Sequence, residues 1–216
     1  MTTSLSLVAE AVCRQVLSAT DQLNRLDGVA GDGDLGVTMA AAARAVIAIA
    51  PGLDAKPLDE GLRELGTTVA RRAPSTAGTL VATAFLAMAR VPVEEDERVV
   101  EGAARRLAAA QEAIESRGGA HPGEKTLLDA LAPAVEALRG AARDGKSLQQ
   151  AVDTAASAAR DGVEQTRGMR AQVGRAGWLA DRSEGSPDAG AVLVAIVIEA
   201  VRDALTSSTT AAQSGE

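Results

Sequence analysis

Apolar residues recur along this chain at intervals of three, four and seven, and most of them are small. Hydrophobic residues make up 46% of the 216 residues, yet aromatic residues make up only 1% and tyrosine is absent. Alanine is the best helix former and fills the core of a β-sheet poorly, so this pattern predicts an all-α protein. A chain of this length is long enough for one well-buried domain.

The apolar spacing predicts eight helices, most of them joined by short loops. Ser147, followed three residues later by Gln150, is typical of a capping box at a helix N-terminus. Short connections favour antiparallel neighbours, so we expect an antiparallel eight-helix barrel or bundle. The stretch 78–91 is apolar on nearly every face, which is typical of a central, buried helix. We expect helices at about 4–26, 36–50, 58–69, 78–91, 94–117, 127–138, from 147 onward, and 189–205.

The chain is expected to form a single domain over residues 1–206. Residues 207–216, with the sequence SSTTAAQSGE, have the polar composition of a disordered tail.

Charge and composition exclude several classes of partner. The net charge is −7, from 22 basic and 29 acidic residues, and no basic run is present. With almost no aromatic side chains to stack on bases, the chain is a poor candidate for binding nucleic acid. The apolar run 191–198 is too short to span a bilayer, the N-terminus lacks the features of a signal peptide, and the single cysteine, Cys13, cannot form an internal disulfide. We therefore expect a cytoplasmic protein with no nucleic-acid or membrane partner.

The strongest chemical signal is an acidic, glycine-rich segment after the first expected helix. Asp27, Asp32 and Asp34 fall within eight residues, and interleaved glycines allow the backbone to turn tightly. Clustered carboxylates repel one another unless a cation lies between them, and oxygen ligands suit Mg²⁺ or Ca²⁺ rather than Zn²⁺. These three aspartates are therefore predicted to bind a divalent metal ion, for which Mg²⁺ completed by water and phosphate oxygens fits best.

Three other interpretations of this segment compete with a metal site. The glycine spacing G-x-G-x-x-G formally matches a dinucleotide fingerprint, but that fingerprint follows a strand and here a helix precedes it. An EF-hand would place a bidentate Glu where this chain has Thr38. A solvated turn would explain one Asp-Gly pair. Three aspartates and three glycines that open a helix favour a binding site instead.

Two segments are candidates for phosphate contacts. A helix that begins near Gly36 directs its free N–H groups and positive dipole end toward the acidic segment, and Thr38 adds a hydroxyl. The loop 73–79 is rich in small and hydroxyl residues. Ser75 and Thr76 in this loop suit either a phosphate cradle or an ordinary helix N-cap.

The remaining polar features are weaker. Residues 170–188 form a long stretch with little periodicity that contains Arg175, Arg182 and the only tryptophan, Trp178. Long loops of this kind are more often functional than not, so it is a second site candidate. The single histidine, His121, lies in a Gly- and Pro-rich loop and gives little support to a Ser–His–acid or Cys–His mechanism.

Several motifs follow one another in a fixed order along the chain. They are G-D-G-D-L-G after an upstream aspartate, T-A-G, G-E-K-T-L-L-D-A-L (123–131), G-R-A-G-W-L-A-D-R-S (174–183) and D-A-G-A (188–191). In this order and spacing they resemble the nucleotide-binding L subunit of dihydroxyacetone kinases over nearly the whole chain. The resemblance implies a barrel of eight antiparallel helices with Mg–ADP or Mg–ATP at one end. It also implies that the three aspartates are the metal ligands.

The resemblance further implies which residues contact the nucleotide. The matching positions are Leu35, Gly36, Val37, Thr38, Thr76, Ala77, Gly118, Leu127, Arg182, Asp188, Ala189 and Gly190, and Ser75 and Gly78 complete the predicted phosphate loop. Three places differ from the family pattern. Leu35 replaces a histidine, the loop before residue 80 lacks the family's Ser and Pro, and Ala189 replaces a proline.

By the same resemblance, this chain carries no catalytic base of its own. The ketose is held by a separate subunit or domain, on which the base is also expected. The implied function is that of the nucleotide-binding subunit of a dihydroxyacetone-type, short-ketose kinase, a phosphotransferase active only with its partner. Two roles of the nucleotide stay open: ATP is a substrate, or ADP is a resident coenzyme that a phosphocarrier protein recharges. The alternatives are the kinase domain of a fatty-acid kinase and a non-catalytic, divalent-cation-binding helical module.

Overall fold

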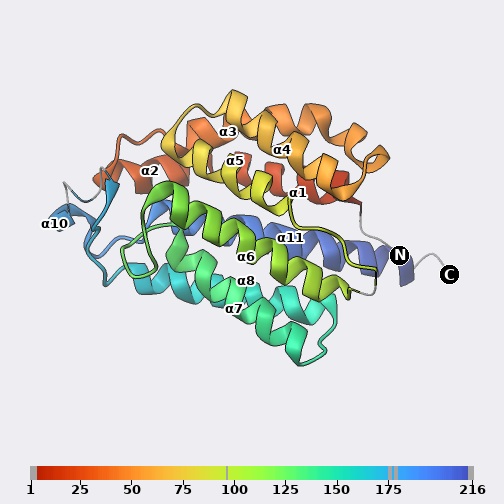
Figure 1. Ribbon diagram of the computed structural model, residues 1–216. Coiled ribbons are helices and arrows are strands. Elements are labelled where there is room, and N and C mark those ends of the chain that lie inside the picture. The colour runs from red at the N-terminus through yellow and green to blue at the C-terminus, as the bar shows by residue number, and fades with distance from the viewer. Residues whose placement is uncertain (1–3, 96, 175–176, 178–179, 214–216) are drawn as a thin grey trace.

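The computed structural model describes residues 4–95, 97–174, 177 and 180–213, and every regular element in these ranges is a helix (Figure 1). The all-α prediction is therefore confirmed. The elements are α1 (Leu5–Ser18), α2 (Thr20–Ala30), α3 (Leu35–Ile49), the 3₁₀ helix η1 (Ala50–Ala55), α4 (Leu58–Arg72), α5 (Thr76–Met88), α6 (Val99–Gly118), α7 (Leu128–Arg143), α8 (Leu148–Thr166), α10 (Ala180–Ser183) and α11 (Ala189–Gln213).

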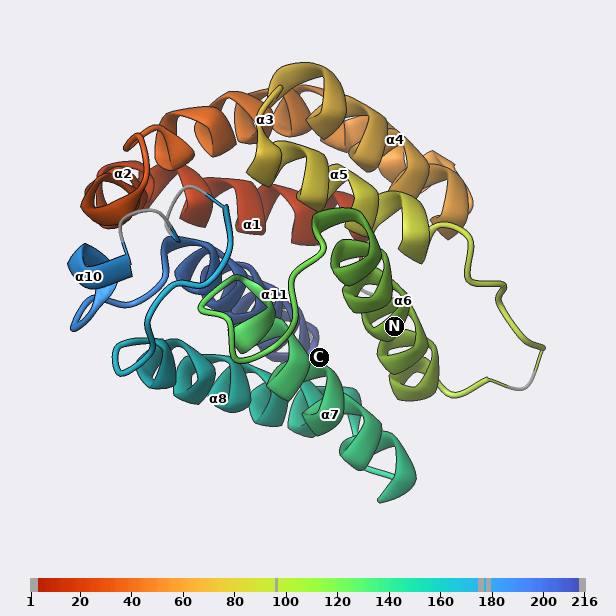
Figure 2. The ribbon, with the colours of Figure 1, turned by 60° about the vertical axis from the view of Figure 1, so that its left-hand side comes forward.

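The long helices form a closed ring. In the described part of the chain α1, α3, α4, α5, α6, α7, α8 and α11 each pack against the next, and α11 packs back against α1. Figures 1 and 2 show that neighbours in this ring run in opposite directions, with α2 at one end beside α1. The expected antiparallel eight-helix barrel is confirmed.

The antiparallel order sorts the connections into two ends. The connections 31–34, 73–75, 119–127 and 167–188 lie at one end, which we call the loop end (Figure 1). The start of α1, η1 and the end of α11 lie at the opposite end. Because α3, α5, α7 and α11 all begin at the loop end, the positive dipole ends of four helices lie there together.

The first expected helix, 4–26, is two helices in the structure. The hydroxyls of Ser18 and Thr20 donate to the carbonyl oxygens of Gln15 and Leu17, each at 2.8 Å, on either side of a break at Ala19. Hydroxyl groups that bond to a preceding carbonyl bend helices. After the break α2 continues to Ala30, so Asp27 lies on a helix and not in the following loop.

Two further expectations need correction. Residues 207–216, predicted as a disordered tail, continue α11 as far as Gln213, because extending an existing helix costs far less than starting one. Residues 214–216 lie outside the described residues. The apolar helix α5 was expected to be central, but it is part of the barrel wall and buries fully only Gly78 and Ala82 within its span.

The capping box at Ser147 is confirmed: its hydroxyl accepts the N–H of Gln150 at 3.3 Å, and the Gln150 side chain accepts the N–H of Ser147 at 3.0 Å.

One stretch of the described residues, Leu35–Ala55, is long and apolar enough by composition alone to cross a membrane, with a mean hydropathy of 1.6. Met39, Val46 and Leu53 from this stretch are buried in the barrel core. Core packing therefore accounts for its apolar face.

Small residues let the helices of the ring approach closely. A Cβ atom placed on Gly162 of α8 would overlap the carbonyl oxygen of Asp129 on α7 and lie 3.1 Å from the Cα of Ala130. Backbone atoms cannot move aside as a flexible side chain can, so this contact accepts no larger residue.

We therefore expect Gly162→Ala to lower the free energy of unfolding by about 1–3 kcal/mol, because the new methyl group separates α7 from α8. Urea denaturation followed by circular dichroism measures the change. Gly140→Ala is the matched control on α7, where the nearest atom to the new Cβ is 3.9 Å away. That variant should be up to about 1 kcal/mol more stable, since alanine favours helix. Equal stability of the two variants would contradict the packing argument.

Candidate metal and phosphate site

The acidic loop is organised by one carboxylate oxygen of Asp27. Oδ2 accepts hydrogen bonds from three successive backbone N–H groups, those of Gly33, Asp34 and Leu35, at 2.9, 3.0 and 3.3 Å. The φ of Gly33 is +77°, a value that a residue with a side chain adopts only at a cost. The loop therefore folds back over the end of α2, and α3 begins immediately after it.

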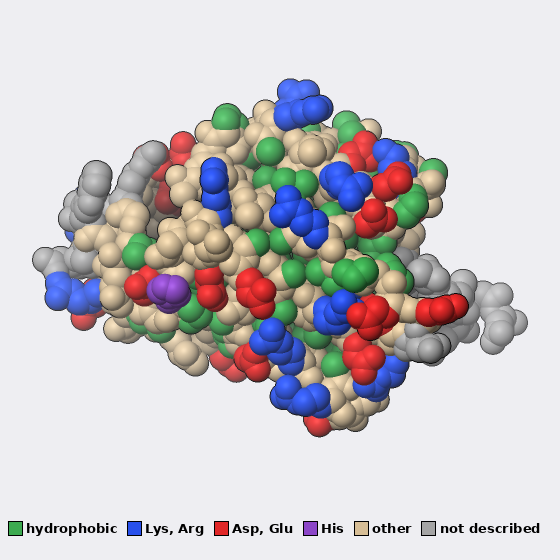
Figure 3. All heavy atoms as spheres, viewed as in Figure 1, with side chains coloured by type: hydrophobic (Ala, Val, Ile, Leu, Met, Phe, Trp, Pro, Cys, Tyr) green, Lys and Arg blue, Asp and Glu red, His purple; other side chains and the backbone are tan. Residues whose placement is uncertain are grey.

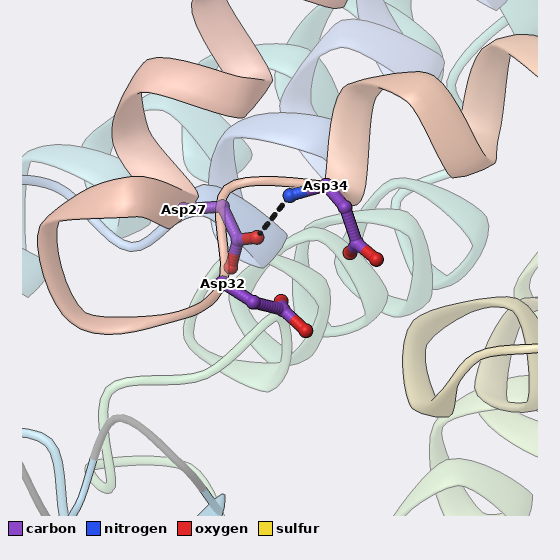
Figure 4. A group of neighbouring side chains, drawn as sticks. All are labelled: Asp27, Asp32 and Asp34. Carbon is purple, nitrogen blue, oxygen red and sulfur yellow. Dashed lines mark hydrogen bonds between the residues drawn. The ribbon is translucent and has the colours of Figure 1, made fainter.

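The three predicted metal ligands come together in this fold. Asp27, Asp32 and Asp34 each offer one carboxylate oxygen, and these atoms all lie within 4.8 Å of one another. Figure 4 shows the side chains of Asp32 and Asp34 on the same side of the loop, with the carboxylate of Asp27 beside them. Ligand oxygens around an octahedral Mg²⁺ lie roughly 3–4 Å apart, so small side-chain rotations bring this set to metal geometry. The donor set fits a hard divalent cation.

Asn24, which the sequence analysis missed, fixes the start of α3. Its Oδ1 accepts the N–H of Val37 at 3.1 Å, one turn before Asp27 on the same face of α2. A Cβ on Gly36 would overlap the carbonyl oxygen of Thr20 and lie 2.7 Å from that Oδ1. The glycine therefore lets α3 cross closely over α2. The only sequence signal for this role of Asn24 was its position, as a polar residue three positions before a predicted metal ligand.

Of the other predicted contacts in this turn, Leu35 is buried, Val37 is 59% exposed and Thr38 is partly buried. The side chain of Leu35 thus packs in the core, and Leu35 can contact a ligand only through its backbone.

At the start of α5 the N-cap interpretation is confirmed. The hydroxyl of Ser75 accepts the N–H of Gly78 at 3.1 Å. Gly78 is buried, and a Cβ there would lie 2.6 Å from the Cβ of Ala73, so packing explains this glycine. Thr76 is exposed and Ala77 is partly buried. The first turn of α5 therefore presents Thr76 to the solvent at the loop end.

The starts of α7 and α11 meet. Leu127 is the N-cap residue of α7, and a Cβ on Gly190 would lie 3.1 Å from its Cβ and 3.3 Å from its backbone nitrogen. Asp188 precedes α11, and its Oδ2 accepts the N–H of Ala191 at 2.7 Å. Gly118, at the end of α6, is exposed.

Burial governs the electrostatics of Asp188. Withdrawal from water raises the pKa of its carboxyl, and the nearby Asp129 adds to this rise, while the N–H groups of Ala191 and Gly190 and the ammonium of Lys125 oppose it. The resulting pKa is about 6. Its own N–H donates to Thr166 Oγ1 at 2.9 Å.

Lys125 is a second functional candidate that the sequence analysis missed. It is 5% exposed, and its Nζ donates to the carbonyl oxygens of Ser183, Ser186 and Met169 at 2.6, 2.8 and 3.0 Å. Burial lowers the pKa of Lys125, an effect opposed by Asp188 and Glu184. A lysine in a motif of charged and small residues carries no sequence signal for such contacts.

A small cavity joins the acidic loop to the 167–188 connection. Its volume is about 50 Å³, and Asp27, Lys125, Asp188 and Ala189 are among the residues that line it. A space of this volume is large enough for water and too small for a nucleotide. Helix α10, which carries the exposed Arg182, contacts α2 at the same end. Arg175 and Trp178 lie outside the described residues.

A larger cavity of about 630 Å³ lies far from these residues, between α6, α7 and the 89–98 connection. Part of its charged lining is paired, with Arg105 bonded to Glu94 and Glu97 at 2.6 and 2.5 Å. None of the predicted site residues belongs to it.

His121 is exposed at the loop end, and Figure 3 shows it among acidic side chains. On the same face basic and acidic side chains are interspersed.

Comparison with known proteins supports the motif analysis. The DAK2 domain family matches residues 29–203. An L-erythrulose kinase of Pectobacterium atrosepticum is 35% identical over 92% of this chain and 34% of its own length. The "PEP-dependent dihydroxyacetone kinase 1, ADP-binding subunit DhaL" of Listeria innocua is 31% identical over 83% of this chain and 84% of its own length.

Among solved structures, the dihydroxyacetone kinase of C. freundii in complex with AMP-PNP and Mg²⁺ superposes with a TM-score of 0.70 and 29% identity, over 92% of this chain and 33% of that one. The chain thus spans about a third of the length of the erythrulose kinase and of the C. freundii enzyme.

The contact at Gly36 predicts that Gly36→Ala lowers the free energy of unfolding by about 2 kcal/mol or more, because the methyl group forces α3 away from α2. Urea denaturation measures this loss. Gly28→Ala is the control in the same region, since its Cβ would lie 3.8 Å from the nearest atom, the Cα of Gly33. Gly28→Ala should be as stable as the parent or slightly more stable. A Gly36→Ala protein as stable as Gly28→Ala would refute the close crossing.

Titration of Asp188 predicts a pH dependence of stability. Its pKa is raised in the folded protein, so between about pH 4 and pH 6 the folded state binds the proton more tightly than the unfolded chain. The free energy of unfolding therefore falls as pH rises through this range, by up to about 3 kcal/mol from this group alone. Asp188→Asn removes the contribution. Melting temperatures of both proteins at pH 4 to 7, without nucleotide, should converge or cross as pH rises; parallel curves would show that Asp188 titrates normally.

Proposed function

This chain belongs to the DAK2 domain family, and we propose that it presents Mg²⁺-ATP or Mg²⁺-ADP for phosphoryl transfer to a short ketose held by a partner subunit or domain. One observation carries the proposal. A cluster of three carboxylates lies at the same barrel end as four helix N-termini, so a cation site and an anion site adjoin. A metal–polyphosphate complex is the ligand that needs both.

In this proposal Asp27, Asp32 and Asp34 hold Mg²⁺, which neutralises charge on the transferred phosphoryl group. The N–H groups of Val37 and Gly78 already donate to Asn24 Oδ1 and Ser75 Oγ. Phosphate oxygens are therefore contacted by the backbone N–H of Gly36 and by the first turn of α5, Ser75 to Ala77. Their dipoles are fixed before the ligand arrives, so no reorganisation opposes binding.

The remaining predicted contacts come from the other connections at the loop end. The exposed Arg182 adds positive charge near the polyphosphate. Gly118, Leu127 and the start of α11, Asp188 to Gly190, flank the nucleoside. Leu127 and Gly190 already lie in contact, which supports placing them on one wall of the site.

In this proposal the partner binds the ketose that accepts the phosphoryl group. We infer no catalytic base in this chain, and the partner supplies the base and the ketose. The relatives support this division, because the C. freundii and Pectobacterium enzymes are about three times as long as the region matched here, whereas the Listeria relative is named as a subunit. Dihydroxyacetone and erythrulose, the acceptors in these names, support a short ketose as the class of substrate that we propose. We propose a cytoplasmic location for the assembled kinase.

The donor can reach the site in two ways. The C. freundii enzyme was solved with an ATP analogue, whereas the Listeria subunit is named as ADP-binding and PEP-dependent. In the first case ATP exchanges at every turnover; in the second, bound ADP is recharged by a phosphocarrier protein. Mass spectrometry of nucleotide retained through purification distinguishes them, since only a resident coenzyme survives dilution.

We expect calorimetry to detect binding of Mg-ADP or Mg-ATP to this chain, and Asp32→Ala to weaken it at least 100-fold through loss of a metal ligand. Asp59→Asn is the control. It removes an exposed carboxylate on α4 that pairs with Arg63 at 3.4 Å, and surface pairs of this kind contribute little. Absence of nucleotide binding at millimolar Mg²⁺ would leave the non-catalytic cation-binding module. Binding without phosphoryl transfer to a ketose on any purified ketose-binding partner would favour a fatty-acid-type kinase domain.

A further inference from the structure

We propose that Lys125 is the positioning residue of the nucleotide site: it fixes the 167–188 connection against the start of α7 without touching the ligand. The inference rests on the proposed function, because it assigns Lys125 a role in nucleotide affinity. The structural part of the proposal, that Lys125 holds the connection in place, depends only on the contacts of Lys125.

The contacts of Lys125 all reach one segment. Its Nζ donates to the carbonyl oxygens of Met169, Ser183 and Ser186, so one side chain from the 119–127 connection joins both halves of the 167–188 connection. An ammonium group has three donors, and three carbonyl oxygens accept them here. With 5% exposure and all three donors engaged, the group has no donor left for a phosphate.

Removing this ammonium takes one charge-assisted hydrogen bond from each of three carbonyl oxygens in a buried or partly buried setting. Lys125 therefore binds two described parts of the connection, at Met169 and at Ser183 to Ser186, to the start of α7.

Lys125 itself is held in place by Asp129. The carboxylate oxygens of this buried residue accept the N–H groups of Gly123 and Thr126, at 2.5 and 2.6 Å, on either side of Lys125. The φ of Lys125 is +61°, in the left-handed region that residues with a side chain rarely adopt. Strained backbone of this kind persists only where surrounding contacts determine it.

The two connections also bond through their backbones. The N–H of Gln172 donates to Glu124 O at 3.2 Å, and its side chain donates to Gly123 O at 3.1 Å. Within the connection, Ala171 N–H donates to Ser183 Oγ at 3.2 Å. Lys125 is thus the charged centre of a larger set of hydrogen bonds.

The site depends on where this segment lies. It carries Arg182 and ends at Asp188, and the cavity beside Lys125 is lined on its other side by Asp27. If the connection moves, the predicted contacts on α10 and at the start of α11 move relative to the acidic loop. The expected result is weaker nucleotide binding with an intact metal cluster.

The test compares Lys125→Met and Lys125→Arg with Lys146→Met, which changes an exposed lysine at the far end of the barrel. Lys125→Met should raise the Kd for Mg-ADP at least tenfold by calorimetry, and Lys125→Arg, which keeps the charge and donors, should recover part of that loss. The affinity of the nucleotide-free protein for Mn²⁺, measured by electron paramagnetic resonance, should stay within about twofold. Lys146→Met should match the parent in both measurements.

Hydrogen exchange gives a readout independent of nucleotide. In Lys125→Met the amides of Ala171, Gln172 and Gly185 should exchange faster, while those of Gly33 and Leu35, bonded to Asp27, should not change. Parent-like Kd or parent-like exchange at Ala171, Gln172 and Gly185 would overturn the proposal. If Lys125→Met does not fold, Lys125→Gln, which keeps one polar donor, is measured against the same two criteria. If the parent protein binds no nucleotide, the proposed function fails, and the exchange data still decide whether Lys125 holds the connection.

Discussion

The site depends on one carboxylate oxygen of Asp27 that accepts three successive backbone N–H groups. This interaction folds the acidic loop back on α2 and places the first residue of α3. It also sets the rotamer of Asp27, so the carboxylate lies beside those of Asp32 and Asp34 before any ion arrives. One side chain thus organises the loop with one oxygen and leaves the other for a metal. Preorganisation of this kind lowers the entropy lost on binding.

The barrel supplies what the loop alone lacks. A chain with a net charge of −7 is a poor match for a polyphosphate anion unless positive potential is concentrated where the anion binds. An up-and-down ring of helices achieves this by topology, because every second helix begins at the same end. The positive ends of α3, α5, α7 and α11 therefore gather at the loop end. The buried ammonium of Lys125 adds no free donor to this site, because its charge is directed at backbone carbonyl oxygens.

Much of the fold and the cation site could be predicted from the sequence, because both depend on local patterns. Small apolar residues at helical spacing predict a helical ring, and Asp27, Asp32 and Asp34 are close in sequence as well as in space. The missed features depend on distant partners. Asn24 and Lys125 bind backbone groups of other segments, which no side-chain pattern encodes. The break at Ala19 depends on single hydroxyl bonds to preceding carbonyl oxygens. The extension of α11 to Gln213 depends on helix propagation. Neither feature can be predicted from composition.

The contacts of Asp27, Asn24 and Lys125 share one property: each side chain binds main-chain groups rather than other side chains. Main-chain groups are the same whatever residue carries them. The segments that these three hold, the acidic turn and the 167–188 connection, are therefore free to exchange most of their side chains during evolution while keeping their shape. A scaffold held in this way can diversify its acceptor and its partner while its donor site stays unchanged.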